Sequence, residues 1–146
     1  MKKTILLLIL ILLSFNTFSQ TGWVWQNPLP QGNTLQSVCY INAPTGIAVG
    51  GSGTILRTTN SGSSWEVTTS GTTSDLYSVF FIDANTGAAA GVDGTILRTT
   101  NGGVNWSIQS TGTVVTLLSI HFINANTGTA VGEGGTILRT TNNGAN

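Results

Sequence analysis

Short apolar runs alternate with clusters of turn-forming residues along most of the chain, and this pattern repeats. The segment Thr54–Asn60 recurs as Thr95–Asn101 and again as Thr136–Asn142, each time 41 residues later. Other positions keep the same spacing, among them Leu35, Leu76 and Leu117. A gapless repeat of this length indicates a chain made of equal structural modules packed side by side.

The second module shows which strands each repeat forms. Residues 76–82 are rich in aromatic and β-branched residues, which favours a strand. Two further strands are predicted at Ala88–Ala90 and Thr95–Thr100, and a fourth begins at Trp106–Ile108. Because the first and third strands carry apolar residues on both faces, we expect neighbouring sheets to cover both sides.

Turn-forming residues separate these strands. At Asp83–Gly87 we expect Asn85 and Gly87 to supply positive φ angles, and Asp93–Gly94 is typical of a tight hairpin. A further turn is predicted at Asn101–Gly103. Four antiparallel strands in roughly 40 residues predict an all-β fold, namely a β-propeller with four-stranded blades.

The same period divides the chain. Residues 34–74 and 75–115 are two full blades, and residues 116–146 are a third that ends where a tryptophan is expected next. Residues 20–33 are predicted to hold an N-terminal strand that closes a ring by completing the last blade. Since a propeller has at least four blades, we expect the chain to be the incomplete N-terminal fragment of a larger ring.

Residues 1–19 are predicted to be a secretory signal peptide. Lys2 and Lys3 precede nine consecutive aliphatic residues, Ile5–Leu13, and small residues at Thr17 and Ser19 suit a cleavage site. Nine aliphatic residues fall well short of the roughly 20 needed to cross a bilayer. We therefore expect an exported protein, in the periplasm, at the cell surface or secreted, without a membrane span in its mature chain.

Composition excludes several classes of function. Charged residues make up 7% of the chain, against about 25% in an average protein. Beyond the predicted signal peptide, the sequence has three arginines and five acidic residues. It therefore offers no basic patch for nucleic acid. One cysteine, Cys39, and one histidine, His121, cannot form a disulfide or a zinc cluster. His121 shares its repeat position with Cys39 and Phe80, which indicates packing. We expect no cofactor and no metal.

A recurring turn follows the third strand of each blade. Thr58–Trp65 and Thr99–Trp106 resemble the Asp-box, or BNR repeat, of pattern S/T-x-D/N-x-G-x-x-W, and a third copy lacks only its tryptophan. Its asparagine is expected to bond backbone amides, its glycine to permit the bend and its tryptophan to pack between blades. The predicted structural residues are Asn60, Gly62, Trp65, Asn101, Gly103, Trp106, Asn142 and Gly144.

The longer pattern is more particular than an Asp-box. Gly-Thr-Ile-Leu-Arg-Thr-Thr-Asn-x-Gly-x-x-Trp, preceded by Thr-Gly-x-Ala-x-Gly, resembles the photosystem II stability and assembly factor family over residues 23–146. Exported bacterial propellers share this domain. The resemblance implies a non-catalytic scaffold that binds a protein or cell-surface partner, which in photosynthetic members is a reaction-centre subunit.

The candidate binding residues are Arg57, Arg98 and Arg139, which occupy one position in successive blades. One interpretation is an arginine array for a carboxylate or an acidic partner, because the guanidinium group suits carboxylates. The alternative is that each arginine packs between blades and bonds backbone carbonyl groups, since a residue present in every repeat usually serves the repeat.

A glycan-active enzyme is the alternative function. Sialidases share Asp-boxes and use arginines against a sugar carboxylate, but their arginines come from unlike places, including a Phe/Tyr-Arg-Ile-Pro motif that this sequence lacks. They also need a Tyr–Glu pair and an acid/base Asp. In this interpretation the catalytic residues of a sialidase-like propeller would lie beyond Asn146.

Overall fold

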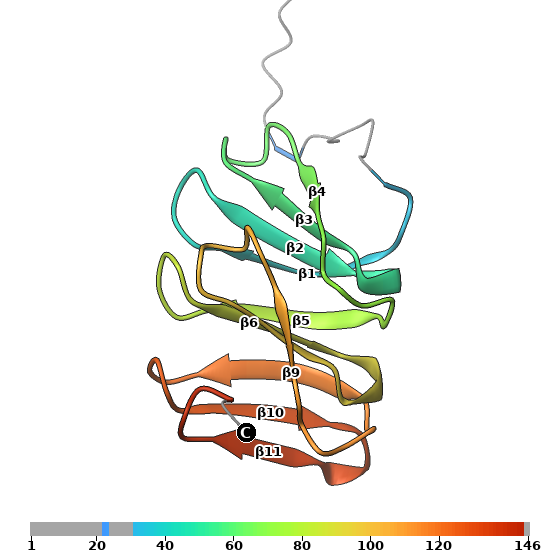
Figure 1. The fold of residues 1–146 in the computed structure, drawn as a ribbon. Coiled ribbons are helices and arrows are strands. Elements are labelled where there is room, and N and C mark those ends of the chain that lie inside the picture. The colour runs from blue at the N-terminus through green and yellow to red at the C-terminus, as the bar shows by residue number, and fades with distance from the viewer. Residues whose placement is uncertain (1–21, 24–30, 145–146) are drawn as a thin grey trace, which may run out of the picture.

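The computed structural model describes residues 22–23 and 31–144, which fold into antiparallel β-sheets joined by short turns (Figure 1). The predicted signal peptide, residues 1–19, and most of the predicted closing strand in residues 20–33 lie outside the described residues. Within those described residues, no helix is long and apolar enough to cross a membrane.

Each sheet is formed by strands that pair in chain order. The first sheet contains β1 (Leu35–Tyr40), β2 (Gly46–Gly50), β3 (Ile55–Thr58) and β4 (Glu66–Thr68). The second contains β5 (Leu76–Phe81), β6 (Gly87–Gly91), β7 (Ile96–Thr99) and β8 (Ser107–Gln109). In the described residues the third contains β9 (Leu117–Phe122), β10 (Gly128–Gly132) and β11 (Ile137–Thr140). The predicted all-β fold is confirmed.

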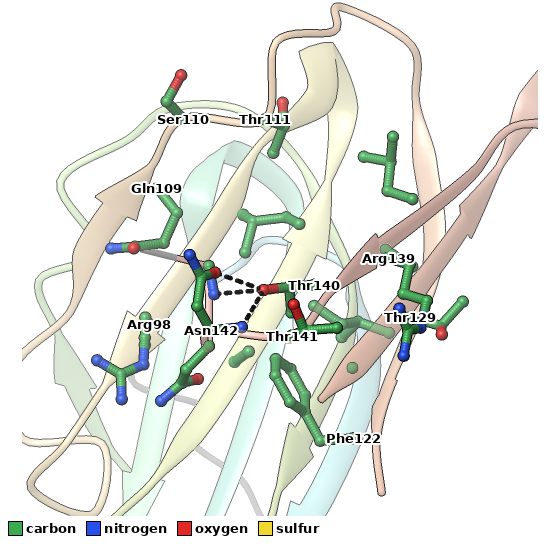
Figure 2. Close-up of a pocket in the computed structure, with 18 residues that line it drawn as sticks. Arg98, Gln109, Ser110, Thr111, Phe122, Thr129, Arg139, Thr140, Thr141 and Asn142 are labelled. Carbon is green, nitrogen blue, oxygen red and sulfur yellow. Dashed lines mark hydrogen bonds between the residues drawn. The ribbon is translucent and has the colours of Figure 1, made fainter. Parts of the chain in front are cut away.

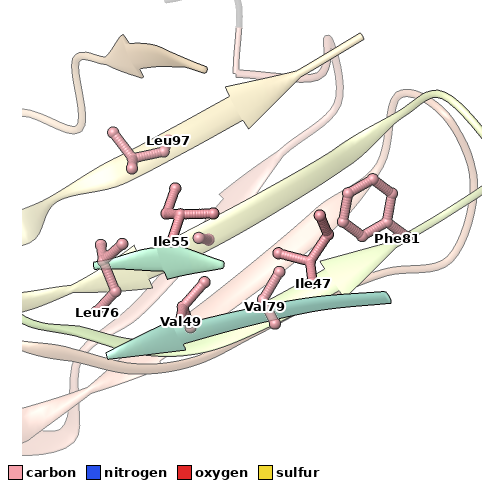
Figure 3. Packing of buried hydrophobic residues seen from close by; sticks show 8 residues of the cluster. Ile47, Val49, Ile55, Leu76, Val79, Phe81 and Leu97 are labelled. Carbon is pink, nitrogen blue, oxygen red and sulfur yellow. The ribbon is translucent and has the colours of Figure 1, made fainter. Parts of the chain in front are cut away.

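The sheets stack face to face (Figure 1). An apolar cluster lies in each of the two interfaces. In the first interface, Leu76, Val79 and Phe81 of β5 pack against residues of β2 and β3 such as Ile47 and Ile55 (Figure 3). In the second interface, residues of the second and third sheets form another cluster, whose buried members are Ala88, Ala90, Leu117, Ile120, Phe122 and Ala130. The middle sheet is therefore covered on both faces, as its sequence predicts.

The outer sheets expose positions whose counterparts are buried. Val38 on β1 is 58% exposed, whereas Val79, one repeat later, is buried. Ile137 on β11 is 71% exposed, whereas Ile55 is fully buried at the equivalent place in the first sheet. Burial of a repeat position therefore depends on whether a neighbouring sheet covers it.

A tight hairpin joins β6 to β7, as Asp93–Gly94 predicts. Asp93 and Gly94 both adopt left-handed backbone conformations, with φ angles of 56° and 65°. A Cβ atom at Gly94 would lie 2.1 Å from the carbonyl oxygen of Thr113. Glycine is needed here both for its φ angle and for the close approach of another backbone segment.

The turn between β5 and β6 is present, but the prediction of how it closes is wrong. Neither Asn85 nor Gly87 has a positive φ angle. Instead the Asp83 carboxylate accepts hydrogen bonds from the backbone N–H groups of Asn85 and Thr86, both at 2.8 Å. An Asx-type turn of this kind needs no left-handed residue, because the side chain replaces the backbone as the acceptor.

These bonds make the turn sensitive to acid. The backbone N–H groups of Asn85 and Thr86 hold the pKa of Asp83 below its ordinary value. A carboxylate with a lowered folded-state pKa stabilises the fold above the ordinary pKa of an aspartate, about 3.9. That contribution disappears as the pH falls through the folded-state pKa.

Replacing Asp83 by asparagine is expected to remove this pH dependence and keep the turn. Asn124, one repeat later, already bonds Asn126 N and Thr127 N through Oδ1, at 2.9 and 2.8 Å. Urea unfolding at a series of pH values should show the wild-type protein losing stability faster than Asp83→Asn below about pH 4. Parallel curves for the two proteins would contradict the role given to this carboxylate.

Candidate binding site between the second and third sheets

A threonine organises each Asp-box turn, and it is buried in the first two turns and half-buried in the third. Thr99 Oγ1 donates to Asn101 Oδ1 at 3.0 Å and accepts from the backbone N–H groups of Asn101 and Gly103, at 3.3 and 3.0 Å. Thr58 and Thr140 make the same three bonds in their own turns, and Figure 2 marks those of Thr140. Sequence reasoning missed these threonines as site residues, although they stand first in the motif.

The predicted Asp-box asparagines and glycines lie in these turns. Asn60 Oδ1 accepts from Ser64 N, and Asn101 Oδ1 accepts from Asn105 N, both at 2.9 Å. In the third turn, Asn142 Oδ1 accepts from the Thr140 hydroxyl. The glycines that follow are left-handed, with φ angles of 84°, 78° and 75° at Gly62, Gly103 and Gly144.

The two Asp-box tryptophans, Trp65 and Trp106, are half-buried. Each contacts an aromatic ring at the same repeat position. Trp65 stands edge-on to Tyr40, with ring centroids 6.5 Å apart, and Trp106 stands edge-on to Phe81 at 6.0 Å. Trp106 also donates from Nε1 to the carbonyl oxygen of Gly103 at 3.2 Å. It packs against the apolar cluster between the first and second sheets, so its indole lies between two sheets.

The three arginines share a repeat position but not a set of contacts. Arg57 donates from Nε to the carbonyl oxygen of Gly102, in the Asp-box turn of the next sheet, at 2.9 Å. Arg98 Nε is buried and has no hydrogen-bond partner within the described part of the chain. Arg139 is exposed. The hydrogen bond of Arg57 to a backbone carbonyl is the contact that the packing interpretation predicts. Arg98, in contrast, has a buried Nε donor without a hydrogen-bond partner in the described residues.

A cavity of about 340 Å³ lies between the second and third sheets, and Arg98 and Arg139 line it from opposite sides (Figure 2). Its apolar wall includes Ala88, Ile96, Ile120, Phe122 and Leu138. Its polar wall includes Gln109, Thr140, Asn142 and the two arginines. An apolar concave surface with a few polar groups is the usual form of a ligand site. Arg57 does not line this cavity; it lies at the preceding interface.

In the part of the chain that the structure describes, the lining of the cavity includes no histidine and no cluster of metal-binding side chains. In residues 22–23 and 31–144, no three His, Cys, Asp or Glu side chains come together as a metal ion would require. His121 stacks on Phe80 with ring centroids 4.1 Å apart, and Cys39 packs half-buried against the first core cluster. Both side chains make packing contacts.

Solved structures of known proteins resemble this fold. A structure of YCF48 bound to a D1 peptide is 26% identical with a TM-score of 0.73, and the match covers 81% of this chain and 39% of that one. YCF48 from Cyanidioschyzon merolae is also 26% identical, with a TM-score of 0.71 and coverage of 82% and 40%. This chain thus spans about two fifths of the length of the YCF48 structures.

The structure of one enzyme is similar to this chain in fold only. The crystal structure of an ancestral GH74 enzyme is 19% identical over 75% of this chain and 17% of that one, with a TM-score of 0.62. A search of curated proteins finds no match.

The family assignment comes from the sequence. The family described as photosynthesis system II assembly factor YCF48, a BNR-repeat family, matches residues 12–100, which is more than half of the chain. Together with the YCF48 structures, this match accounts for the repeat, the Asp-box turns and the stacked sheets. The chain belongs to the YCF48 assembly-factor family, and its sheets are successive blades of a β-propeller.

Proposed function

We propose that this protein is an exported, non-catalytic propeller scaffold that binds an acidic segment of a partner protein at the cavity between its second and third blades. Membership of an assembly-factor family carries the proposal, because one solved YCF48 holds a D1 peptide. The export part is supported by the charged and aliphatic pattern of Met1–Ser19.

The charges at the cavity support an acidic partner. In the described residues Arg98 has a buried Nε donor without a hydrogen-bond partner. The exposed Arg139 also lines the cavity and lies across it from Arg98 (Figure 2). A guanidinium group pairs best with a carboxylate, and a hydrogen bond to a charged group is roughly twice as strong as a neutral one. Since Arg57 is already bonded to a backbone carbonyl, the proposal narrows the predicted arginine array to Arg98 and Arg139.

Binding of a fluorescently labelled polyglutamate peptide tests this proposal, with polyglutamine as the neutral probe. We expect the wild-type protein to bind polyglutamate and the double variant Arg98→Gln/Arg139→Gln to bind it at least about tenfold more weakly, as two lost charge-assisted bonds imply. Fluorescence anisotropy at constant, moderate salt measures both affinities.

The matched control is the double variant Thr69→Glu/Thr73→Glu. Both threonines are exposed and lie outside the cavity, and the two substitutions lower the net charge by the same amount as the arginine pair. The control should bind polyglutamate nearly as well as wild type at that salt concentration. Equal losses in the two double variants would show a general charge effect and overturn the assignment to Arg98 and Arg139.

A further inference from the structure

We propose that the pair Asn101–Gly102 is a latent deamidation site, which the folded Asp-box turn keeps unreactive and which converts to aspartate and isoaspartate when that turn opens. The pair lies between β7 and β8 of the second blade. The modification would occur in the chain itself, so it is independent of the proposed binding function.

An asparagine followed by glycine is open to attack by the backbone that follows it. The Gly102 nitrogen would lose its proton to solvent and form a bond to Cγ of Asn101, and the side-chain nitrogen would take up a proton and leave as ammonia. Water then opens the cyclic imide at either of its two carbonyl groups, which gives aspartate or isoaspartate. Glycine favours the first step because it has no Cβ atom to obstruct the ring. The sequence contains two such pairs, Asn101–Gly102 and Asn143–Gly144.

The nitrogen that would attack is held by a hydrogen bond in the folded protein. Gly102 is buried, and its N–H group donates to the carbonyl oxygen of Asn85 at 2.9 Å. Ser61 and Asn143, at the equivalent places in the other turns, make the same kind of backbone bond at 2.9 and 2.8 Å. Because the nitrogen must lose this proton before it can attack, the bond opposes the reaction.

The carboxamide that would be attacked is held as well. Asn101 Oδ1 accepts from the Thr99 hydroxyl at 3.0 Å and from the backbone N–H of Asn105 at 2.9 Å. The carbonyl oxygen of Gly102 accepts from Arg57 Nε at 2.9 Å, which fixes the other end of the reacting pair. The carboxamide cannot turn toward the Gly102 nitrogen while these bonds hold it. We therefore expect the reaction to wait for the turn to open.

The two products would affect the turn differently. The bonds to Thr99 and Asn105 are both accepted by Oδ1 of Asn101, so an aspartate can keep them, and its charge strengthens them. Isoaspartate adds a methylene group to the backbone between Thr99 and Gly103, which the Thr99 hydroxyl now bridges at 3.0 Å. We expect the turn to re-form with aspartate but not with isoaspartate.

Peptide mapping of the full 146-residue chain tests the proposal. Trypsin cleaves after Arg98 and Arg139, which places the two Asn–Gly pairs in separate peptides, residues 99–139 and 140–146. The protein is held at mildly alkaline pH in buffer or in guanidinium chloride, and mass spectrometry with fragmentation measures conversion at each asparagine. In denaturant both pairs should convert at similar rates. In buffer Asn101 should convert at least about tenfold more slowly than in denaturant, because two or more hydrogen bonds must break first.

A variant of the turn separates local opening from global unfolding. Thr99→Val removes the hydroxyl that holds Asn101 Oδ1, so Asn101 should convert severalfold faster in buffer, whereas Thr99→Ser keeps the hydroxyl and should behave like wild type. The matched control is Gly91→Ala, because a Cβ atom at Gly91 would lie 1.9 Å from the carbonyl oxygen of Asp75, outside the turn. This substitution destabilises the same sheet without touching the bonds of Asn101.

Two results would overturn the proposal. Equal conversion of Asn101 in buffer and in denaturant would show that the fold gives no protection. Conversion in buffer that is as fast in Gly91→Ala as in Thr99→Val would show that global unfolding, and not the turn, controls the reaction. If Thr99→Val does not fold, the wild-type comparison still decides.

Denaturant unfolding checks the expected difference between the products. Asn101→Asp should unfold near the wild-type midpoint, since both bonds to Oδ1 remain. Protein enriched in isoaspartate at this position should unfold at a lower midpoint. An Asn101→Asp protein that is as unstable as the isoaspartate form would contradict the role given to the Oδ1 bonds.

Discussion

Replacing Gly91 by alanine is expected to destabilise the protein by about 3 kcal/mol, the upper part of the range for overpacking a well-packed site. Gly91 pairs with Leu76 at the irregular end of the β5–β6 ladder. A Cβ atom there would lie 1.9 Å from the carbonyl oxygen of Asp75 and 3.0 Å from Cα of Leu76. Both contacts are backbone atoms, so no side-chain rotation relieves them.

Urea unfolding followed by circular dichroism measures this loss. Gly32→Ala is the matched control, because a Cβ atom at Gly32 meets nothing within 4 Å. We expect the control to unfold near the wild-type midpoint and Gly91→Ala well below it. A Gly91→Ala protein as stable as the control would show that the two strands separate freely at this point.

The second large effect is expected at Thr99. Valine has almost the shape of threonine, but it cannot accept the N–H groups of Asn101 and Gly103 that now bond Thr99 Oγ1. Thr99 is only 1% exposed, and Gly103 is buried. Leaving a buried donor such as the Gly103 N–H unpaired costs about 1–3 kcal/mol, so Thr99→Val should lose roughly 1–3 kcal/mol of unfolding free energy.

The neighbouring Thr100→Val is the control, since Thr100 is exposed and its change in chemistry is identical. Denaturant titration of both variants should separate them clearly. Similar small losses in the two proteins would mean that water or another group replaces the Thr99 hydroxyl and that the turn does not depend on it.

The repeat made most of the fold predictable. Identical segments such as Thr54–Asn60 and Thr95–Asn101 must fold alike where their surroundings are alike, so strand order and hairpin positions follow from one module. The closure of the turn at Asp83 did not follow. It depends on the distance between a carboxylate and two amides, whereas residue preferences pointed to positive φ angles.

The candidate site was predictable only in part. The repeat identifies Arg57, Arg98 and Arg139 as equivalent. It does not predict which of them donates a hydrogen bond to a backbone carbonyl and which does not. That difference depends on the neighbouring sheet. At the first interface the indole of Trp106 packs against the cluster that holds Ile47 and Phe81, whereas the equivalent Ala88 and Phe122 line the cavity.

Arg139 has a consequence of its own because of its strand. In the described residues β11 is an outer strand of its sheet and pairs only with β10. An edge strand offers free N–H and C=O groups to any other extended chain, and a charged side chain is a common defence against such pairing. The same repeat position therefore has two surroundings: Arg57 is held by a backbone carbonyl of the next sheet, whereas Arg139 carries an exposed charge on this outer strand.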